Sequence, residues 1–159
     1  MSGRGRLLLA RRFLVLIALM FWQGGFTFYA SVVVPTGQAV LESHLEQGYI
    51  TRQVTSWLNL SGAVALVVLA LDLVAAREAG WLRRLRWLLW LGMLGTLVAL
   101  AWLHPHIDQY LNPQFHAVID SAAFHTGHRA YLWVSTVQWG CALVYAWLTL
   151  RAWREADRV

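Results

Sequence analysis

The chain has few charged residues and a single cysteine, and each of these two shortages excludes a class of protein. It also has no lysine, so all of its basic residues besides histidine are arginines. Only 13% of the 159 residues are charged, whereas a typical globular domain has about 25%. So few charges cannot cover a water-soluble globule, and the 58% of hydrophobic residues excludes a disordered chain. Cys141 is the only cysteine, which excludes an internal disulfide and any cysteine-rich zinc or iron–sulfur site.

Motifs that mark common catalytic and phosphate-binding sites are also missing. The chain has no Gly-x-Ser-x-Gly nucleophile elbow and no His-Glu-x-x-His zinc motif. It has no phosphate-binding glycine loop either, because Gly24 and Gly25 lie inside an apolar segment. These absences favour a protein that is not an enzyme.

The arginines give a net charge of +5, and their placement indicates membrane topology rather than nucleic-acid binding. Eleven of the 13 arginines flank apolar segments: they lie in the first 12 residues, between 77 and 86, and after 150. The other two are Arg52 and Arg129. Because arginine-rich connections stay in the cytoplasm, we expect both termini on the cytoplasmic side and no nucleic-acid partner.

Four apolar segments are each long enough to cross a bilayer, whose hydrocarbon core of about 30 Å takes about 20 helical residues. Backbone groups in lipid must bond within their own segment, so these segments are predicted to be helices. Pro35 follows the first segment and is expected to end it. The sequence therefore predicts an all-α fold: a single domain, residues 1–159, forming a four-helix transmembrane bundle with spans at about 13–34, 57–76, 87–103 and 131–150 and outer loops at 35–56 and 104–130.

Four polar side chains lie within the predicted spans. Gln23, Asn59 and Gln138 either hydrogen-bond across the bundle and hold its helices together, or line a ligand or translocation path. Asp72 is the only carboxylate within a span and lies near the cytoplasmic interface. It is expected either to snorkel to that interface and pair with an arginine such as Arg77, or to serve in proton or substrate transfer.

All six histidines fall on the predicted outer side, together with several carboxylates. Pro105 is expected to prevent a regular helix, and an extended stretch would put the two flanking histidines and the next aspartate on one face. Histidine and carboxylate groups suit a divalent transition metal, and bis-histidine haem ligation and pH sensing are further alternatives. The structural alternative is headgroup contact and helix capping. The candidate metal ligands are His104, His106, Asp108, His125 and His128.

The segment from Phe21 to Pro35 reads Phe-Trp-Gln-Gly-Gly-Phe-Thr-Phe-Tyr-Ala-Ser-Val-Val-Val-Pro, a Gly-Gly aromatic run that leads to a Val-x-x-Pro exit. It resembles the first span of small four-helix bacterial membrane proteins. These are the transmembrane-protein-205-like family of unknown function and, more distantly, the copper-resistance D-like domain. The resemblance implies a four-span fold in the bacterial inner membrane and assigns no activity.

Three functions are compatible with these features. The first is an accessory or assembly subunit that acts through a membrane partner, which the compact size and the lack of a soluble catalytic domain favour. The second is a metal- or haem-binding protein that uses the outer histidines. The third is a small oligomeric transporter with Gln23, Asn59 and Gln138 around a central path. The expected partners are the lipid bilayer and either another membrane protein or further copies of the chain.

Overall fold

The computed structural model describes residues 3–41, 44–76, 80–112 and 117–158, and nearly all of them are helical. A first helical rod is continuous from Gly3 to Val40. It consists of α1 (Gly3–Leu19), the π-helical turn η1 (Met20–Gly24), α2 (Gly25–Phe28), the π-helical turn η2 (Tyr29–Val33) and α3 (Val34–Val40). The other rods are α4 (His44–Ala75), α5 (Trp81–Asp108) and α6 (Ser121–Ala156). Between α5 and α6, β1 (Leu111–Asn112) pairs antiparallel with β2 (Ala117–Val118).

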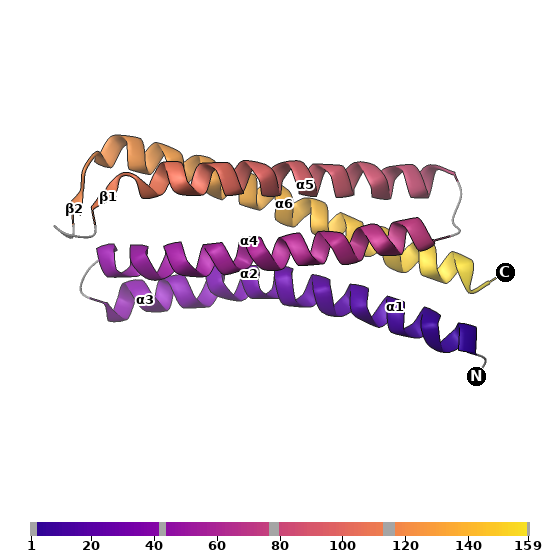
Figure 1. Ribbon diagram of the computed structural model, residues 1–159. Coiled ribbons are helices and arrows are strands. Elements are labelled where there is room, and N and C mark those ends of the chain that lie inside the picture. The colour runs from indigo at the N-terminus through magenta and orange to yellow at the C-terminus, as the bar shows by residue number, and fades with distance from the viewer. Residues whose placement is uncertain (1–2, 42–43, 77–79, 113–116, 159) are drawn as a thin grey trace.

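The four rods formed by the described residues lie side by side in an elongated bundle (Figure 1). One end, which we call the terminal end, carries both chain termini and the connection between α4 and α5. The opposite end, which we call the hairpin end, carries the connection between α3 and α4 and the β1–β2 hairpin. The prediction of an all-α four-helix bundle is confirmed.

Three of the helices are long and apolar enough to cross a membrane: Gly3–Val40, Glu46–Ala75 and Trp81–Asp108. α6 has 36 residues and therefore a length of about 54 Å. Its apolar character is diluted by polar side chains that it buries inside the bundle, namely Ser135, Gln138 and Thr149. The predicted spans are thus confirmed as membrane-compatible helices in three cases, and the fourth span stays a prediction.

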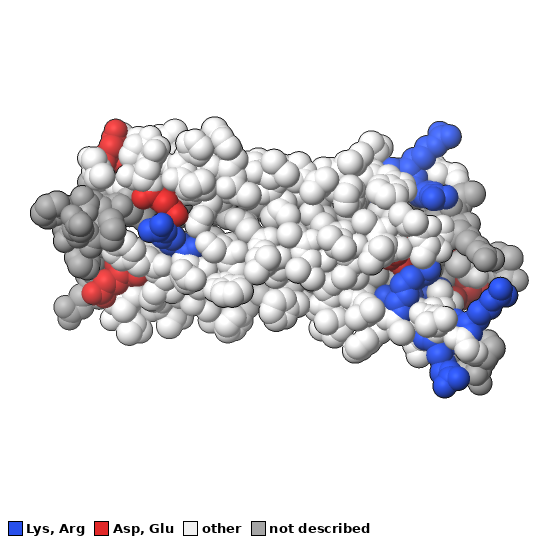
Figure 2. Space-filling view, viewed as in Figure 1, with Lys and Arg blue, Asp and Glu red and all other residues white. Residues whose placement is uncertain are grey.

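The surface of the bundle is apolar along its middle. Phe21 and Val67 expose 74% and 60% of their surfaces. On the face shown in Figure 2, charged side chains occur only near the two ends of the bundle. Contact with water would cost such a belt roughly 25 cal/mol per Å² of apolar surface, whereas lipid tails cover it without that cost. This belt and the three long apolar helices favour a place in a membrane.

The first predicted outer loop, residues 35–56, is mostly helical. α3 reaches Val40 and α4 begins at His44, so Pro35 lies inside the first rod instead of ending it. Pro35 is in the first turn of α3, directly after the π-helical turn η2, so the rod has an irregular turn where the proline removes a backbone hydrogen bond. The expectation that this proline stops the helix is therefore wrong.

The second predicted outer loop, residues 104–130, is helical at both of its ends. α5 continues to Asp108 although Pro105 lies in its last turn, where the missing N–H removes only one backbone hydrogen bond. α6 begins at Ser121 because the Asp120 carboxylate caps it, accepting a hydrogen bond of 2.9 Å from the N–H of Ala123. The expectation of an extended stretch at Pro105 is therefore wrong.

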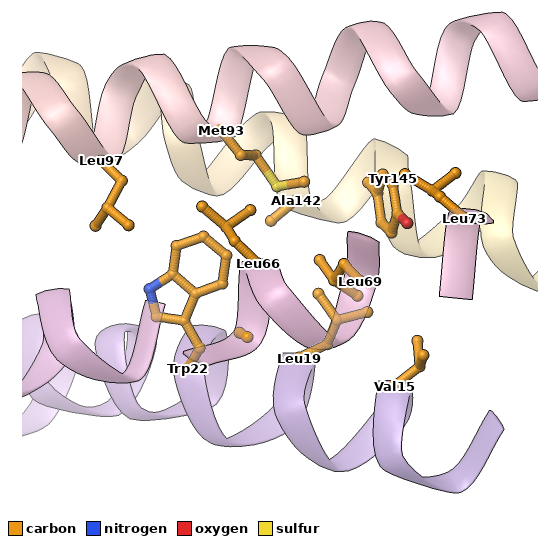
Figure 3. Close-up of a cluster of buried hydrophobic side chains, with 11 residues drawn as sticks. Val15, Leu19, Trp22, Leu66, Leu69, Leu73, Met93, Leu97, Ala142 and Tyr145 are labelled. Atoms are coloured by element: carbon orange, nitrogen blue, oxygen red, sulfur yellow. The ribbon is translucent and has the colours of Figure 1, made fainter. Parts of the chain in front are cut away.

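Large side chains from all four rods meet in the middle of the bundle (Figure 3). Trp22 of η1 is 2% exposed and packs on Gly62 of α4, where a Cβ atom would lie 2.7 Å from the indole nitrogen. Leu66, Met93 and Tyr145 extend this core across α4, α5 and α6. An apolar layer therefore lies between the polar groups of the two ends.

Candidate binding cleft at the hairpin end and a buried charge cluster

A cleft of about 520 Å³ opens between the rods at the hairpin end. Its volume is within the range of roughly 300–1,000 Å³ that is usual for small-molecule sites. All four rods contribute to it. Its apolar lining includes Phe26, Val34, Leu58, Ile107 and Leu132, and its polar lining includes Gln47, Thr51, Arg52, Thr55, His104, Asp108, His125, His128 and Tyr131.

The cleft is long, and its inner end is mainly apolar, with Ser135 as a polar residue there. On α6 its lining runs from Phe124 to Ser135, which are eleven positions apart and so about 16 Å along the helix. Phe26 and Leu58 are the lining residues on their rods that lie farthest from the hairpin end. The charged groups lie nearer the hairpin end, so the site offers an apolar base and a polar rim.

The polar rim is built around an ion pair between Arg52 of α4 and Asp108 of α5. The Nε of Arg52 lies 2.9 Å from the Oδ2 of Asp108. His104, one turn before Asp108 on α5, places its Nδ1 3.6 Å from the same oxygen. The helical geometry of Pro105 and its neighbours creates this arrangement, because positions four apart share one face of a helix. One carboxylate thus holds an arginine and a histidine in place.

Thr55, His104 and Asp108 follow one another in the order of a nucleophile, a base and an orienting acid. The Nε2 of His104 lies 3.2 Å from the Oγ1 of Thr55 and 3.2 Å from the carbonyl oxygen of Arg52. However, the Thr55 hydroxyl donates to the carbonyl of Thr51 at 2.5 Å. The one hydroxyl proton of Thr55 is therefore directed at a backbone carbonyl and not at His104, so the arrangement does not activate Thr55 as a nucleophile.

A second hydrogen-bond group fixes the wall between the first rod and α4. The hydroxyl of Tyr29 donates to the Oγ1 of Thr51 at 2.9 Å, and this Oγ1 donates to the carbonyl of Gln47 at 2.8 Å. Gln47 is 5% exposed and packs so closely on Gly37 that a Cβ atom there would overlap its side-chain amide. The glycine therefore allows α3 to approach α4 at the mouth of the cleft.

The α6 wall of the cleft contributes two histidines and a phenylalanine. The rings of Phe124 and His128 are parallel to within 6°, with centroids 6.1 Å apart. Burial lowers the pKa of His128 from 6.5, and the neighbouring His125 lowers it further because like charges repel. His128 is therefore held in its neutral form more firmly than a free histidine.

Four of the five predicted metal ligands line the cleft, namely His104, Asp108, His125 and His128. His106 points elsewhere, with its Nδ1 2.6 Å from the carbonyl oxygen of Trp102. The expected common face of His106 and its neighbouring histidine is therefore wrong. Within the described ranges, no three His, Cys, Asp or Glu side chains lie close enough to hold a metal ion. His116 lies outside the described residues, so the metal and haem hypotheses stay predictions.

Two of the predicted intramembrane polar residues make hydrogen bonds between helices. Asn59 of α4 accepts a bond of 3.4 Å from the hydroxyl of Tyr131 on α6. Gln138 of α6 donates to the Oγ1 of Thr96 on α5 at 3.2 Å. Both also line a cavity of about 20 Å³ beside the cleft, which is enough for about one water molecule. Gln23 lines neither cavity and only its backbone carbonyl accepts a described bond, from the Thr27 hydroxyl.

At the terminal end, Asp72 of α4 is fully buried between two arginines. Its Oδ2 lies 2.7 Å from an Nη of Arg86 on α5, and its Oδ1 lies 3.0 Å from the Nε of Arg11 on α1. Arg86 also donates to the hydroxyl of Tyr145 on α6 at 3.4 Å and lies over the tyrosine ring. This charge cluster joins all four rods.

The charge cluster corrects the expectation for Asp72. The carboxylate does not snorkel, since its exposed fraction is 0%. It does pair with arginines, but these are Arg11 and Arg86, while Arg77 lies outside the described residues. Sequence reasoning placed Arg86 in the cytoplasmic connection and missed its burial. The available signal was spacing, because Asp72 and Arg86 lie eight and six residues on either side of Gly80, whose φ of 87° turns the chain between α4 and α5.

A comparison of the chain with known protein families, curated proteins and solved structures finds no match. The resemblance of the segment from Phe21 to Pro35 to small four-span membrane proteins therefore stays a prediction. The candidate sites are argued from their own geometry.

Proposed function

We propose that this chain is an integral protein of the bacterial inner membrane that binds a small amphiphilic molecule, with an apolar chain and a polar head, in the cleft at its hairpin end. The observation that carries the proposal is the cleft, with a volume of about 520 Å³, an apolar base and a polar rim. Such a combination of apolar walls and a few convergent polar groups is typical of ligand sites.

In this proposal the terminal end faces the cytoplasm and the hairpin end faces the outside. The support is the distribution of arginine, because ten of the twelve arginines that the structure describes lie in the three segments that belong to the terminal end. Connections rich in arginine stay in the cytoplasm. Both termini lie at this end, as an even number of membrane crossings requires.

The outer leaflet is the source of the amphiphile in this proposal. Three exposed tryptophans near the cleft mark the level of the outer headgroups, where indole rings are favoured. They are Trp57 on α4, Trp102 on α5 and Trp133 on α6, exposed by 63%, 61% and 72%. Two leucines that line the cleft are sequence neighbours of these tryptophans: Leu58 follows Trp57, and Leu132 precedes Trp133. The apolar part of the cleft therefore lies at the outer membrane interface, where headgroups meet lipid chains.

The proposed activity is binding rather than catalysis, because the hydroxyl and imidazole groups that meet in the cleft are already committed to other hydrogen bonds. Thr55 donates its hydroxyl proton to a backbone carbonyl, and the Nε2 of His104 lies 3.2 Å from both the Thr55 hydroxyl and the Arg52 carbonyl. We propose that the bound amphiphile is presented to a membrane partner, in keeping with the accessory role that the sequence favours.

A photolabelling experiment tests the proposal. The protein is reconstituted in vesicles of phosphatidylethanolamine and phosphatidylglycerol that contain palmityl alcohol with a diazirine in its chain. A cleft-filling variant, Gly48→Phe, adds a ring at a lining position where a Cβ atom meets nothing within 4 Å. The matched control is Gly95→Phe, a helical glycine that also has open space for a Cβ atom and does not line the cleft.

Adducts on cleft residues such as Phe26 and Leu132 are expected in the wild-type protein and in the control. In Gly48→Phe these adducts are expected to fall by about tenfold, which corresponds to a loss of about 1.4 kcal/mol, because the added ring takes up part of the cleft. Adducts spread evenly over the lipid-facing surface, with no difference between the two variants, contradict the proposal.

A further inference from the structure

The cleft has more groups that can carry positive charge than carboxylates, and this imbalance indicates the charge of the ligand's head. Among the described lining residues Asp108 is the only carboxylate, whereas Arg52, His104 and His125 are capable of positive charge. We infer that the cleft selects an amphiphile with an anionic oxygen head, a carboxylate or a phosphate, which Arg52 binds while the apolar chain extends toward Phe26 and Leu58. This inference rests on the proposed function and adds the class of ligand.

Arg52 has hydrogen-bonding capacity to spare for such a head. The Asp108 carboxylate occupies the Nε edge of its guanidinium at 2.9 Å, and within the described residues no bond from either Nη atom is recorded. The Arg52 side chain is 45% exposed and lines the cleft. A guanidinium presents its donors as a planar fork that matches the two oxygens of a carboxylate or phosphate. Asp108 thus occupies one edge of the fork, where it competes with the ligand for Arg52, and leaves the other edge for the ligand.

The position of Arg52 fits a lipid head. Trp57 marks the outer headgroup level and lies five residues deeper along α4, which is about 7 Å. Leu58 and Leu132 lie at the level of the exposed tryptophans that neighbour them in sequence. A molecule that places its chain against these leucines therefore brings its head to Arg52 and His104, one to two helical turns nearer the outside.

The charged groups of the cleft disfavour ligands with a cationic or a neutral head. A cationic head would meet Arg52, and its one possible counter-charge, Asp108, is already shared between Arg52 and His104. A neutral hydroxyl head would accept a hydrogen bond without the extra strength that a negative charge gives to it. Preference for an acid over the matching alcohol is therefore the measurable signature of this site.

The test compares two diazirine probes with the same chain, palmitic acid and palmityl alcohol, in the reconstituted protein. Three variants are used: Arg52→Gln, Asp108→Asn and the control Arg129→Gln, whose arginine is exposed and does not line the cleft. Wild-type protein and the control are expected to label more strongly with the acid. Arg52→Gln is expected to lose acid labelling by about tenfold, the effect of losing one charge-assisted contact, and to keep its labelling by the alcohol.

Asp108→Asn is expected to change acid labelling in the opposite direction to Arg52→Gln. Because misfolding would lower the labelling, a rise separates an effect on the head-binding group from misfolding. Removing the carboxylate frees Arg52, so acid labelling is expected to rise several-fold while alcohol labelling stays unchanged. Unlabelled lysophosphatidic acid and unlabelled palmitate then compete with the acid probe, and the stronger competitor identifies phosphate or carboxylate as the preferred head.

The two proposals fail in different ways. Equal cleft labelling by acid and alcohol, unchanged in Arg52→Gln, overturns the anionic head and leaves amphiphile binding standing. A fall in acid labelling in Asp108→Asn also overturns the assignment of Arg52 as the head-binding group. Absence of cleft adducts with both probes in the wild-type protein overturns the proposed function itself.

Discussion

Asp72 and Arg86 form an ion pair of 2.7 Å between α4 and α5 in which both side chains are wholly buried. Arg11 approaches the same carboxylate from α1, so that two guanidinium groups share one acid. Burying charge is costly unless the charge is paired. The charge cluster therefore stabilises the terminal end only while Asp72, Arg86 and Arg11 are all present.

The first prediction concerns the loss of this carboxylate. Asp72→Asn removes the buried carboxylate that Arg11 and Arg86 share and is expected to destabilise the protein by about 3–5 kcal/mol. The measurement is the thermal unfolding midpoint in detergent. Asp157→Asn is the control, because it removes the exposed partner of Arg12 and is expected to change the midpoint little. Equal midpoints for the two variants contradict a structural role of Asp72.

The second prediction concerns the contact between the first rod and α4. A Cβ atom at Gly62 would lie 2.7 Å from the indole nitrogen of Trp22, so Gly62→Val is expected to destabilise the bundle by about 1–3 kcal/mol through overpacking. Gly24→Val is the matched control, since a Cβ atom there meets nothing within 4 Å. If thermal melts show the same loss in both variants, helix propensity rather than packing on Trp22 explains it.

The third prediction concerns the pH dependence of the hairpin end. Burial and the neighbouring His125 lower the pKa of His128 below 6.5. The unfolded chain then binds a proton more readily than the folded chain, so folding stability falls as pH drops through 6.5 toward the lowered pKa. Between about pH 7.5 and pH 5.5, the thermal midpoint of His128→Asn is expected to fall less than that of the wild-type protein. His106→Asn, which changes a histidine outside the cleft, is expected to keep the wild-type slope.

Much of the fold could be predicted from composition and arginine placement, because lipid imposes a simple rule on long apolar segments. The helix ends could not be predicted so well. Pro35 and Pro105 indicate a break when judged by the missing N–H alone. In the structure one lies in the first turn of α3 after a π-helical turn, and the other in the last turn of α5.

The candidate site could be predicted only in part, and for a physical reason. Sequence spacing placed His104, Asp108, His125 and His128 near one another, and all four line the cleft. The role of Arg52 was missed because it depends on a contact between α4 and α5 that no local pattern encodes. The burial of Arg86 was missed for the same reason, since flanking arginines usually reach water.

The most direct test of the central claim is native mass spectrometry of the protein released from membranes in a mild detergent. The wild-type protein and Gly95→Phe are expected to carry one additional small amphiphile per chain, released on activation in the gas phase. Gly48→Phe, with its cleft filled, is expected to appear largely without it. A wild-type protein that carries no such mass, or a Gly48→Phe variant that carries it as often as Gly95→Phe, contradicts the account.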